Sequence, residues 1–249
     1  MKNKYQVAAR AVLVALALTA AFAVNTTTAI AQAPPGSLWY NGDFNGVGYH
    51  ANGHNTSDPP DAVHDDFIIP AGNVWNITAV FSDDLLSTAV TGAIWEIRQG
   101  CSVGNGCTLI AGGFTSTPTV TPTGRSGFGY NEFTVEVTGL NGVALTSGVY
   151  WLNVTPIGNG TGRSLDTTTS GTNCVGTPCG NDGMSWFDST GVVFSPDDFS
   201  MGVIGTVVPE PATWTLLGGG LGALLLIARR RRGDPSSCFT RRLPGKRRK

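Results

Sequence analysis

Between residues 34 and 207 the chain repeats short runs in which apolar and polar residues alternate, and turn residues separate these runs. No stretch of ten or more residues in this region has helical spacing of its apolar positions. Alternation with a period of two places one set of side chains in a core and the other set in solvent. Many short strands without a strand–helix–strand rhythm indicate an all-β fold, which we expect to be an antiparallel β-sandwich. A jelly-roll-like topology is preferred, and an immunoglobulin-like one stays open.

The alternation also assigns side chains to faces of the expected strands. Glu96, Glu132 and Glu136 fall on the polar side of their runs, where a solvent-exposed carboxylate contributes to solubility. Trp75, Trp95 and Trp151 fall in the strands and are expected in the core. The strand pattern is clearest in five segments, residues 75–81, 93–98, 132–137, 150–154 and 199–204.

Both ends of the chain carry an apolar segment that basic residues flank on its outer side. At the N-terminus, Lys2, Lys4 and Arg10 accompany the apolar residues 11–24. Ala31-Gln32-Ala33 then supplies the small-x-small pattern that signal peptidase cleaves. We therefore expect residues 1–33 to be a signal peptide, cut after Ala33 or, as a second choice, after Ala31.

The second apolar segment, residues 212–228, is 17 residues long and is followed by four arginines. As a helix it would measure about 25 Å, which just crosses the hydrocarbon core of a membrane. Basic residues stay on the cytoplasmic side of a membrane. This rule predicts one transmembrane helix at 212–228, with both chain ends in the cytoplasm and the region between the two apolar segments exported.

The expected exported region is strongly acidic. Between Ala33 and Ala212 it contains three arginines (Arg98, Arg125 and Arg163), no lysine and 16 acidic residues, a formal charge of −13. Nucleic-acid binding requires clustered lysine and arginine, so this composition disfavours a nucleic-acid partner.

Four of the five cysteines lie in the exported region, and Cys238 lies beyond the expected membrane helix. An even number of cysteines in an oxidising compartment indicates disulfides, and four cysteines allow three pairings. We prefer Cys101–Cys107 and Cys174–Cys179, because each pair brackets a glycine-rich turn and local closure is the easiest.

The C-terminal region resembles a known sorting signal. Val208-Pro209-Glu210-Pro211, the residues 213–218, the apolar run and the arginines 229–232 resemble the PEP-CTERM sorting domain of Gram-negative bacteria. The resemblance implies that exosortase, a membrane transpeptidase-like enzyme, recognises Pro209, Glu210 and Pro211. It also implies an association with exopolysaccharide and the biofilm matrix. Members usually end soon after the arginines, whereas this chain continues with a basic segment, residues 233–249.

The exported region resembles, more loosely, β-sandwich ectodomains that are joined to such tails. The similar segments are residues 65–72 with 75–77, then 147–152, and finally 198–201. These ectodomains bring no activity that can be transferred to the chain. The expected organisation is a signal peptide (1–33), a β-sandwich ectodomain (34–207), the sorting signal with its helix (208–232) and a basic cytoplasmic extension (233–249).

Two kinds of metal site have the right residue types. All three histidines, His50, His54 and His64, fall within 15 residues near Asp61 and Asp65, but in a segment without helical spacing. A structural calcium ion would use loop carboxylates. The calcium candidates are Asp43, Asp65, Asp66 and Asp198, although aspartates at turns and strand ends are common without any metal.

Catalytic motifs are missing from the sequence. It contains neither a GxSxG elbow nor an SxxK motif. A polysaccharide hydrolase with two paired carboxylates stays open as an alternative, because acids that are distant in sequence can converge in the fold. Sugar rings stack on exposed aromatic side chains, and Trp39, Tyr40, Tyr49 and Trp186 occur in turn-rich contexts. We expect these four to be the exposed aromatic residues.

Taken together, the sequence predicts a non-enzymatic exported protein at the cell surface or in the extracellular matrix, with no required cofactor. Its processing partners would be signal peptidase and exosortase, with the inner membrane as a transient anchor. A lectin-like module that binds exopolysaccharide is the first alternative, and a hydrolase of that polymer is the second.

Overall fold

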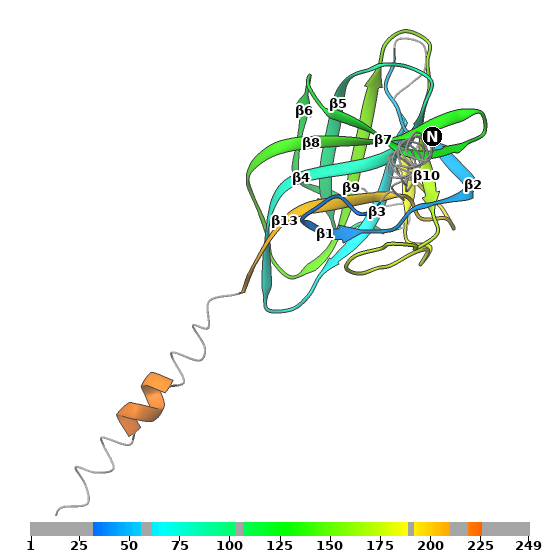
Figure 1. Cartoon of the computed structure of the whole chain (residues 1–249). Helices are drawn as coiled ribbons and strands as arrows, with labels where there is room; N and C mark the ends of the chain where they lie inside the picture. Colours follow the sequence, from blue (N-terminus) through cyan, green and yellow to red (C-terminus); the bar gives the residue numbers. More distant parts are fainter. Residues whose placement is uncertain (1–31, 56–60, 103–106, 189–191, 210–218, 226–249) are drawn as a thin grey trace, which may run out of the picture. The chain divides into compact units, whose positions relative to one another are not determined.

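The computed structural model describes residues 32–55, 61–102, 107–188, 192–209 and 219–225 (Figure 1). The chain divides into two compact units, residues 1–208 and residues 209–249, and we call the first the β unit. Most of the expected signal peptide lies outside the described residues. So do Glu210 and Pro211 of the sorting signal and the basic extension at 233–249.

The described residues form thirteen β-strands and one short helical segment, residues 219–225. The strands are β1 (Ser37–Tyr40), β2 (Phe44–Ala51), β3 (Ala62–Ile69), β4 (Asn73–Leu86), β5 (Val90–Gln99), β6 (Thr108–Thr115), β7 (Thr119–Gly127), β8 (Tyr130–Leu145), β9 (Gly148–Gly158), β10 (Ser164–Thr169), β11 (Trp186–Asp188), β12 (Val192–Phe194) and β13 (Met201–Pro209).

These strands build two antiparallel sheets. In sheet 1 the order is β1-β13-β4-β10-β2, and β8 pairs with both β4 and β7. In sheet 2 the order is β12-β11-β3-β9-β5-β6. The all-β antiparallel prediction is therefore confirmed. Four of the five expected strands lie within β4, β5, β8 and β9, and β13 begins two residues after the expected start of the fifth.

One apolar cluster receives side chains from both sheets. Trp39 of β1 stacks on Phe67 of β3 with 5.5 Å between ring centroids. Phe67 in turn stacks on Trp75 of β4 at 5.9 Å and on Tyr150 of β9 at 5.6 Å. Contacts between rings of opposite sheets show that the two sheets pack on a shared core. Burial of large aromatic side chains is a major source of stability in such a core.

Two of the three tryptophans expected in the core belong to it, Trp75 and Trp95. Trp151 is also buried, but it lies on the opposite face of β9 from Tyr150 and Leu152. There its indole nitrogen donates a hydrogen bond to the Met184 carbonyl at 3.2 Å. A loop thus covers the second face of sheet 2 at this point.

Both preferred disulfides are present in the β unit. Cys101 is bonded to Cys107, with 4.3 Å between their α-carbons, and Cys174 is bonded to Cys179, with 5.5 Å. The first bond closes the end of the β5–β6 hairpin. The second closes a turn in the segment that follows β10.

The helical segment 219–225 belongs to the second unit. Among the described residues, no helix has both the length and the hydropathy that a membrane span requires. Most of the expected transmembrane helix, residues 212–228, lies outside the described residues.

Candidate functional site

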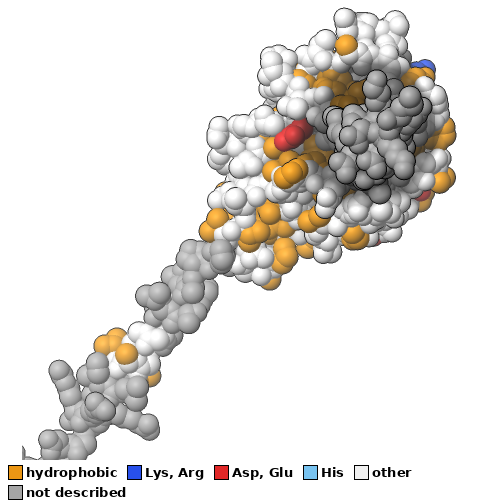
Figure 2. Space-filling model, in the orientation of Figure 1, with side chains coloured by type: hydrophobic (Ala, Val, Ile, Leu, Met, Phe, Trp, Pro, Cys, Tyr) orange, Lys and Arg blue, Asp and Glu red, His pale blue; other side chains and the backbone are white. Residues whose placement is uncertain are grey.

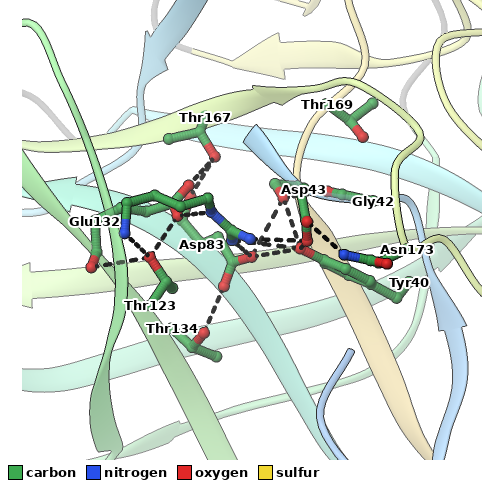
Figure 3. Close-up of polar contacts among 12 residues, drawn as sticks. Tyr40, Gly42, Asp43, Asp83, Thr123, Glu132, Thr134, Thr167, Thr169 and Asn173 are labelled. Atoms are coloured by element: carbon green, nitrogen blue, oxygen red, sulfur yellow. Dashed lines mark hydrogen bonds and ion pairs between the residues drawn. The ribbon is translucent and has the colours of Figure 1, made fainter. Parts of the chain in front are cut away.

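A buried cluster of charged side chains on the outer face of sheet 1 surrounds Arg125 of β7 (Figure 3). Arg125 Nη1 lies 2.8 Å from Asp43 Oδ1, and Nη2 lies 2.9 Å from Asp83 Oδ2. The Nε atom donates to Glu132 Oε2. One guanidinium therefore contacts three carboxylates, and we call these four residues with Tyr40 the arginine network.

The β7–β8 hairpin brings Arg125 and Glu132 together. Its two-residue turn, Phe128-Gly129, has positive φ angles of 54° and 84°. Positive φ at both central residues matches the right-handed twist of the strands, and glycine adopts it without steric cost. Beyond the turn Ser126 pairs with Asn131. Arg125 and Glu132 are the next residues on the two strands, so their side chains meet.

Asp43 reaches the cluster from the connection between β1 and β2. The preceding residue, Gly42, has a φ of 116°, and a β-carbon on it would lie 2.7 Å from the α-carbon of Gly171. Only glycine fits this crossing of two backbones. Asn173, in the segment after Gly171, donates a 2.7 Å hydrogen bond to Asp43 Oδ2. The crossing thus fixes Asp43 against Arg125.

Tyr40 links two of the carboxylates. Its hydroxyl lies 2.9 Å from Asp43 Oδ1 and 2.9 Å from Asp83 Oδ2. A hydroxyl has one proton, so it donates to one of these oxygens at a time. Burial raises the pKa of Tyr40, and the nearby Asp83 raises it further, so the phenol stays protonated.

Threonine hydroxyls satisfy the remaining carboxylate oxygens. Thr123 and Thr167 donate to Glu132 Oε2 and Oε1 at 2.6 and 2.9 Å. Thr134, which pairs with Asp83 across β4 and β8, donates to Asp83 Oδ1 at 2.6 Å. Buried charges are tolerated when they are paired and hydrogen-bonded in this way.

The arginine network has one positive group and three carboxyl groups. Burial raises the pKa of Asp83 to about 6, with the Glu132 carboxylate adding to the rise and Arg125 opposing it. Asp83 therefore takes up a proton at mildly acidic pH, which reduces the excess of negative charge.

Tyr40, Asp83 and Glu132 of the arginine network are buried, whereas the Arg125 side chain is 18% exposed. Tyr40 is 2% exposed, Asp83 1% and Glu132 0%. A hydrolase requires its acid and its second carboxylate to contact the substrate from two sides. Carboxylates that are buried behind Arg125 do not offer this arrangement. The network links β7 and β8 to Asp83 of β4 and to Asp43 in the β1–β2 connection.

Several expectations about exposure are wrong. Glu132 was expected on a solvent face but is buried, because the side chains of Thr123, Arg125 and Thr167 contact its carboxylate there. Trp39, Tyr40 and Trp186 were expected to be exposed, yet each is at most 2% exposed. Trp39 enters the core between the sheets and Tyr40 enters the arginine network on the opposite face. Trp186 is covered by a stacked His64 ring, 3.8 Å between centroids.

The fourth expected aromatic residue, Tyr49, is exposed. Its ring meets Phe128 edge to face, with 4.7 Å between centroids. Tyr49 of β2 and Phe128 of the β7–β8 turn therefore form an exposed aromatic pair, and Phe128 was not singled out from the sequence.

A second polar region lies on the inner face of sheet 1. Asp166 of β10 pairs with Asp84 of β4 on one side and with His50 of β2 on the other. Residues opposite each other in antiparallel strands point to the same face. Asp84 accepts hydrogen bonds from Ser82 and Ser164, at 2.5 and 3.0 Å.

Asp166, in contrast, is fully buried and neither of its carboxylate oxygens has a hydrogen-bond partner among the described residues. Burial raises the pKa of Asp166 well above its usual value, and the Asp84, Asp83 and Asp65 carboxylates raise it further. Burial also raises the pKa of Asp84, to about 7. Acidic side chains in this interior are thus held in or near their neutral forms.

The calcium candidates separate into two places. Asp43 is an ion-pair partner of Arg125. Asp65, Asp66 and Asp198 lie near one another, and Asn41 donates a 2.8 Å hydrogen bond to Asp65. Backbone amides of Asp182 and Gly183 donate to Asp198, and the Phe199 amide donates to Asp65.

The histidines do not form a joint site either. His50 stacks on Phe187 at 3.8 Å between centroids, whereas His64 stacks on Trp186 and lies 3.7 Å from Glu96 Oε2. The neighbouring His64 and the Arg98 guanidinium together lower the pKa of Glu96 to about 2. Within the described ranges, no three His, Cys, Asp or Glu side chains are placed to hold a metal ion.

The clearest functional signal lies at the C-terminal end of the chain, from the last residues of β13 onward. A protein-family model, the PEP-CTERM protein-sorting motif, matches residues 207–232. The chain carries a PEP-CTERM sorting signal. Such a signal implies an exported protein that exosortase processes. The resemblance of the tail to this family is therefore confirmed, and Pro209, Glu210 and Pro211 fall inside the matched range.

The PEP-CTERM motif begins within β13, which ends at Pro209. The matched range therefore overlaps the last three residues of β13. No curated protein and no solved structure matches the chain.

Proposed function

We propose that the chain is a non-enzymatic protein of the cell surface or extracellular matrix, anchored in the inner membrane before exosortase processes it. In this proposal residues 1–33 direct export, and the β unit is a β-sandwich ectodomain of jelly-roll-like topology. Residues 212–228 hold the precursor in the membrane. The mature protein then stays with the exopolysaccharide of the biofilm. The PEP-CTERM motif at residues 207–232 is the observation that carries the proposal.

The buried polar groups of the β unit support a structural role rather than catalysis. Asp83 and Glu132 are satisfied by Arg125 and threonine hydroxyls inside the arginine network. Asp84 and Asp166 lie between the sheets and are fully buried. Catalytic acids and bases must reach the proton that they transfer, and these carboxyl groups are sealed from any substrate.

Mass spectrometry of the mature protein tests the sorting step. We expect a C-terminus near Pro209–Pro211 in cells that contain exosortase, and a chain that ends at Lys249 in cells that lack it. A variant with alanine at Pro209, Glu210 and Pro211 is expected to stay uncut. Alanine at Val47, an exposed residue of β2, is the matched control and is expected to be cut normally. A protein that still ends at Lys249 in both kinds of cell would refute the proposal, because the C-terminal segment would then act only as a membrane anchor.

Carbohydrate binding is the second candidate, because Tyr49 and Phe128 form an exposed aromatic pair. Phe128 adopts a positive φ of 54°, a strained conformation for a bulky residue. An apolar ring face at such a tip suits stacking with a sugar ring. Binding of isolated matrix polysaccharide that Tyr49→Ala abolishes, and Val47→Ala leaves intact, would establish this function. Equal binding by both variants would exclude it at this site.

A further inference from the structure

Strand β6 is the last strand of sheet 2, and among the described strands it pairs with β5 alone (Figure 1). Its outer edge therefore presents backbone N–H and C=O groups without a strand partner. Such an edge is a template on which another strand can add by main-chain hydrogen bonds. Proteins usually protect these edges with lysine, proline or very short strands.

The residues of β6 provide none of the chemical protections. The strand is Thr-Leu-Ile-Ala-Gly-Gly-Phe-Thr, without a charged residue or a proline. Phe114 is 63% exposed, Leu109 51% and Ile110 43%. A bulge at Ile110 interrupts the register with β5, because Ile97 pairs with Ala111 while Arg98 pairs with Leu109. Residues 111–115 remain regular, and five residues are an ordinary strand length.

Other edges of the two sheets are protected. At the β7 edge of sheet 1, Pro122 and Arg125 occupy the strand. The strand β1 has four residues and β12 has three. The pairing between β2 and β10 is irregular, because Thr167 pairs with Tyr49 whereas Thr169, two residues later, pairs with Phe44. Strand β6 has a register shift of its own at Ile110, but residues 111–115 beyond it form a regular stretch without charge or proline.

The conformation of β6 is also restrained by the rest of the β unit, so the edge is preorganised for binding. The Cys101–Cys107 disulfide closes the β5–β6 hairpin at one end, and Ala111 packs against the core. A rigid strand loses little conformational entropy on binding, which favours association.

The charge distribution around β6 allows a second copy of the chain to be the partner. The region between Ala33 and Ala212 has a formal charge of −13, so two copies repel each other over most of their surface. No acidic residue occurs between Glu96 and Glu132, and Glu96 itself is paired with Arg98 at 2.7 Å. The face of the β unit in Figure 2 shows mainly uncharged and apolar surface, with small acidic and basic areas. A second copy can therefore approach through β6 without bringing like charges together.

We propose that β6 is a dimerisation edge, on which β6 of a second copy adds in antiparallel orientation around a two-fold axis. Sheet 2 of one copy and sheet 2 of the other then form one continuous sheet across the dimer. Each copy has one β6 edge and the pairing uses both, so association stops at two copies. Phe114 and Leu109 of one copy cover apolar side chains of the other in this arrangement.

Sedimentation velocity of the full chain in non-ionic detergent, over a range of micromolar concentrations, tests the proposal. We expect a concentration-dependent dimer. Phe114→Lys and Leu109→Lys are expected to raise its dissociation constant about a hundredfold, because each dimer loses the contact twice. Val47→Lys, at an exposed apolar residue of β2, adds the same charge away from β6 and is expected to leave the dimer unchanged.

Each alternative result would overturn the proposal. A monomer at all concentrations excludes the dimerisation edge. A dimer that resists both lysine variants, or oligomers larger than two, places the contact elsewhere, for example in the C-terminal tail. Circular dichroism identifies any variant that fails to fold, and the other lysine variant then decides the question. These outcomes are independent of exosortase processing, because the assay uses the uncut chain.

Discussion

Replacement of Asp166 by asparagine is expected to change how the stability of the β unit depends on pH. Asp166 is fully buried, and its carboxylate has no hydrogen-bond partner in the part of the chain that the structure describes. Burial together with Asp84, Asp83 and Asp65 raises its pKa well above the usual value. The folded chain therefore keeps a proton that the unfolded chain releases above about pH 4. Between that pH and the raised pKa, this single group lowers the free energy of unfolding by about 1.4 kcal/mol per pH unit.

Asparagine does not titrate, so Asp166→Asn removes this pH-dependent loss of stability. At about pH 4 the two proteins should have similar stability, since Asp166 is then protonated in both the folded and the unfolded chain. As the pH rises the variant should become progressively more stable than the wild type. Below its raised pKa of about 7, Asp84 is protonated in both folded proteins and gives the same slope in both, so the comparison is made in that range.

Urea unfolding of the oxidised full chain, followed by tryptophan fluorescence at several pH values, measures this difference. The control is Asp197→Asn, which removes the same formal charge from an exposed position and should change stability by less than about 0.5 kcal/mol at every pH. A variant that shows the wild-type pH slope, or that is destabilised equally at all pH values, would refute the argument that Asp166 is held as a neutral acid.

Two further predictions concern the arginine network and a disulfide. Arg125→Ala should destabilise the β unit by about 3–5 kcal/mol, because it leaves three buried carboxyl groups without their cation; Arg163→Ala, at an exposed arginine, should have little effect in the same urea unfolding assay. Joint replacement of Cys174 and Cys179 by serine should cost roughly 2 kcal/mol, since the bond closes a loop of only a few residues. A loss well above this value in thermal unfolding would show that the bond does more than restrict the unfolded chain.

Local features of the sequence were reliable guides to local structure. The alternation at residues 132–137 predicted a strand, and β8 contains it. The glycine-rich turns between nearby cysteines predicted both disulfides, because closure over five or six residues depends on little beyond the loop itself. The sorting motif at residues 207–232 is likewise a continuous segment that can be recognised without a structure.

Exposure was predicted less well, because alternation alone assumes that one face of each strand meets solvent. Sheet 1 is covered on both faces where Glu132 and Asp83 lie, so these two polar side chains are buried as well. The sequence held one signal for this arrangement. Arg125 is one of only three basic residues in a strongly acidic region, and such a rare cation is a natural partner for buried acids.

The amino-acid sequence by itself determined the strand-rich character of the β unit, its two local disulfides and its sorting signal, since each depends on residues close together in the chain. Tertiary structure alone decided which acids meet Arg125 and which aromatic rings reach the surface. Asp43 and Asn173 are separated by 130 residues and yet share a hydrogen bond. Contacts over such distances depend on how two sheets stack and on what covers their outer faces, and short-range periodicity carries no information about either.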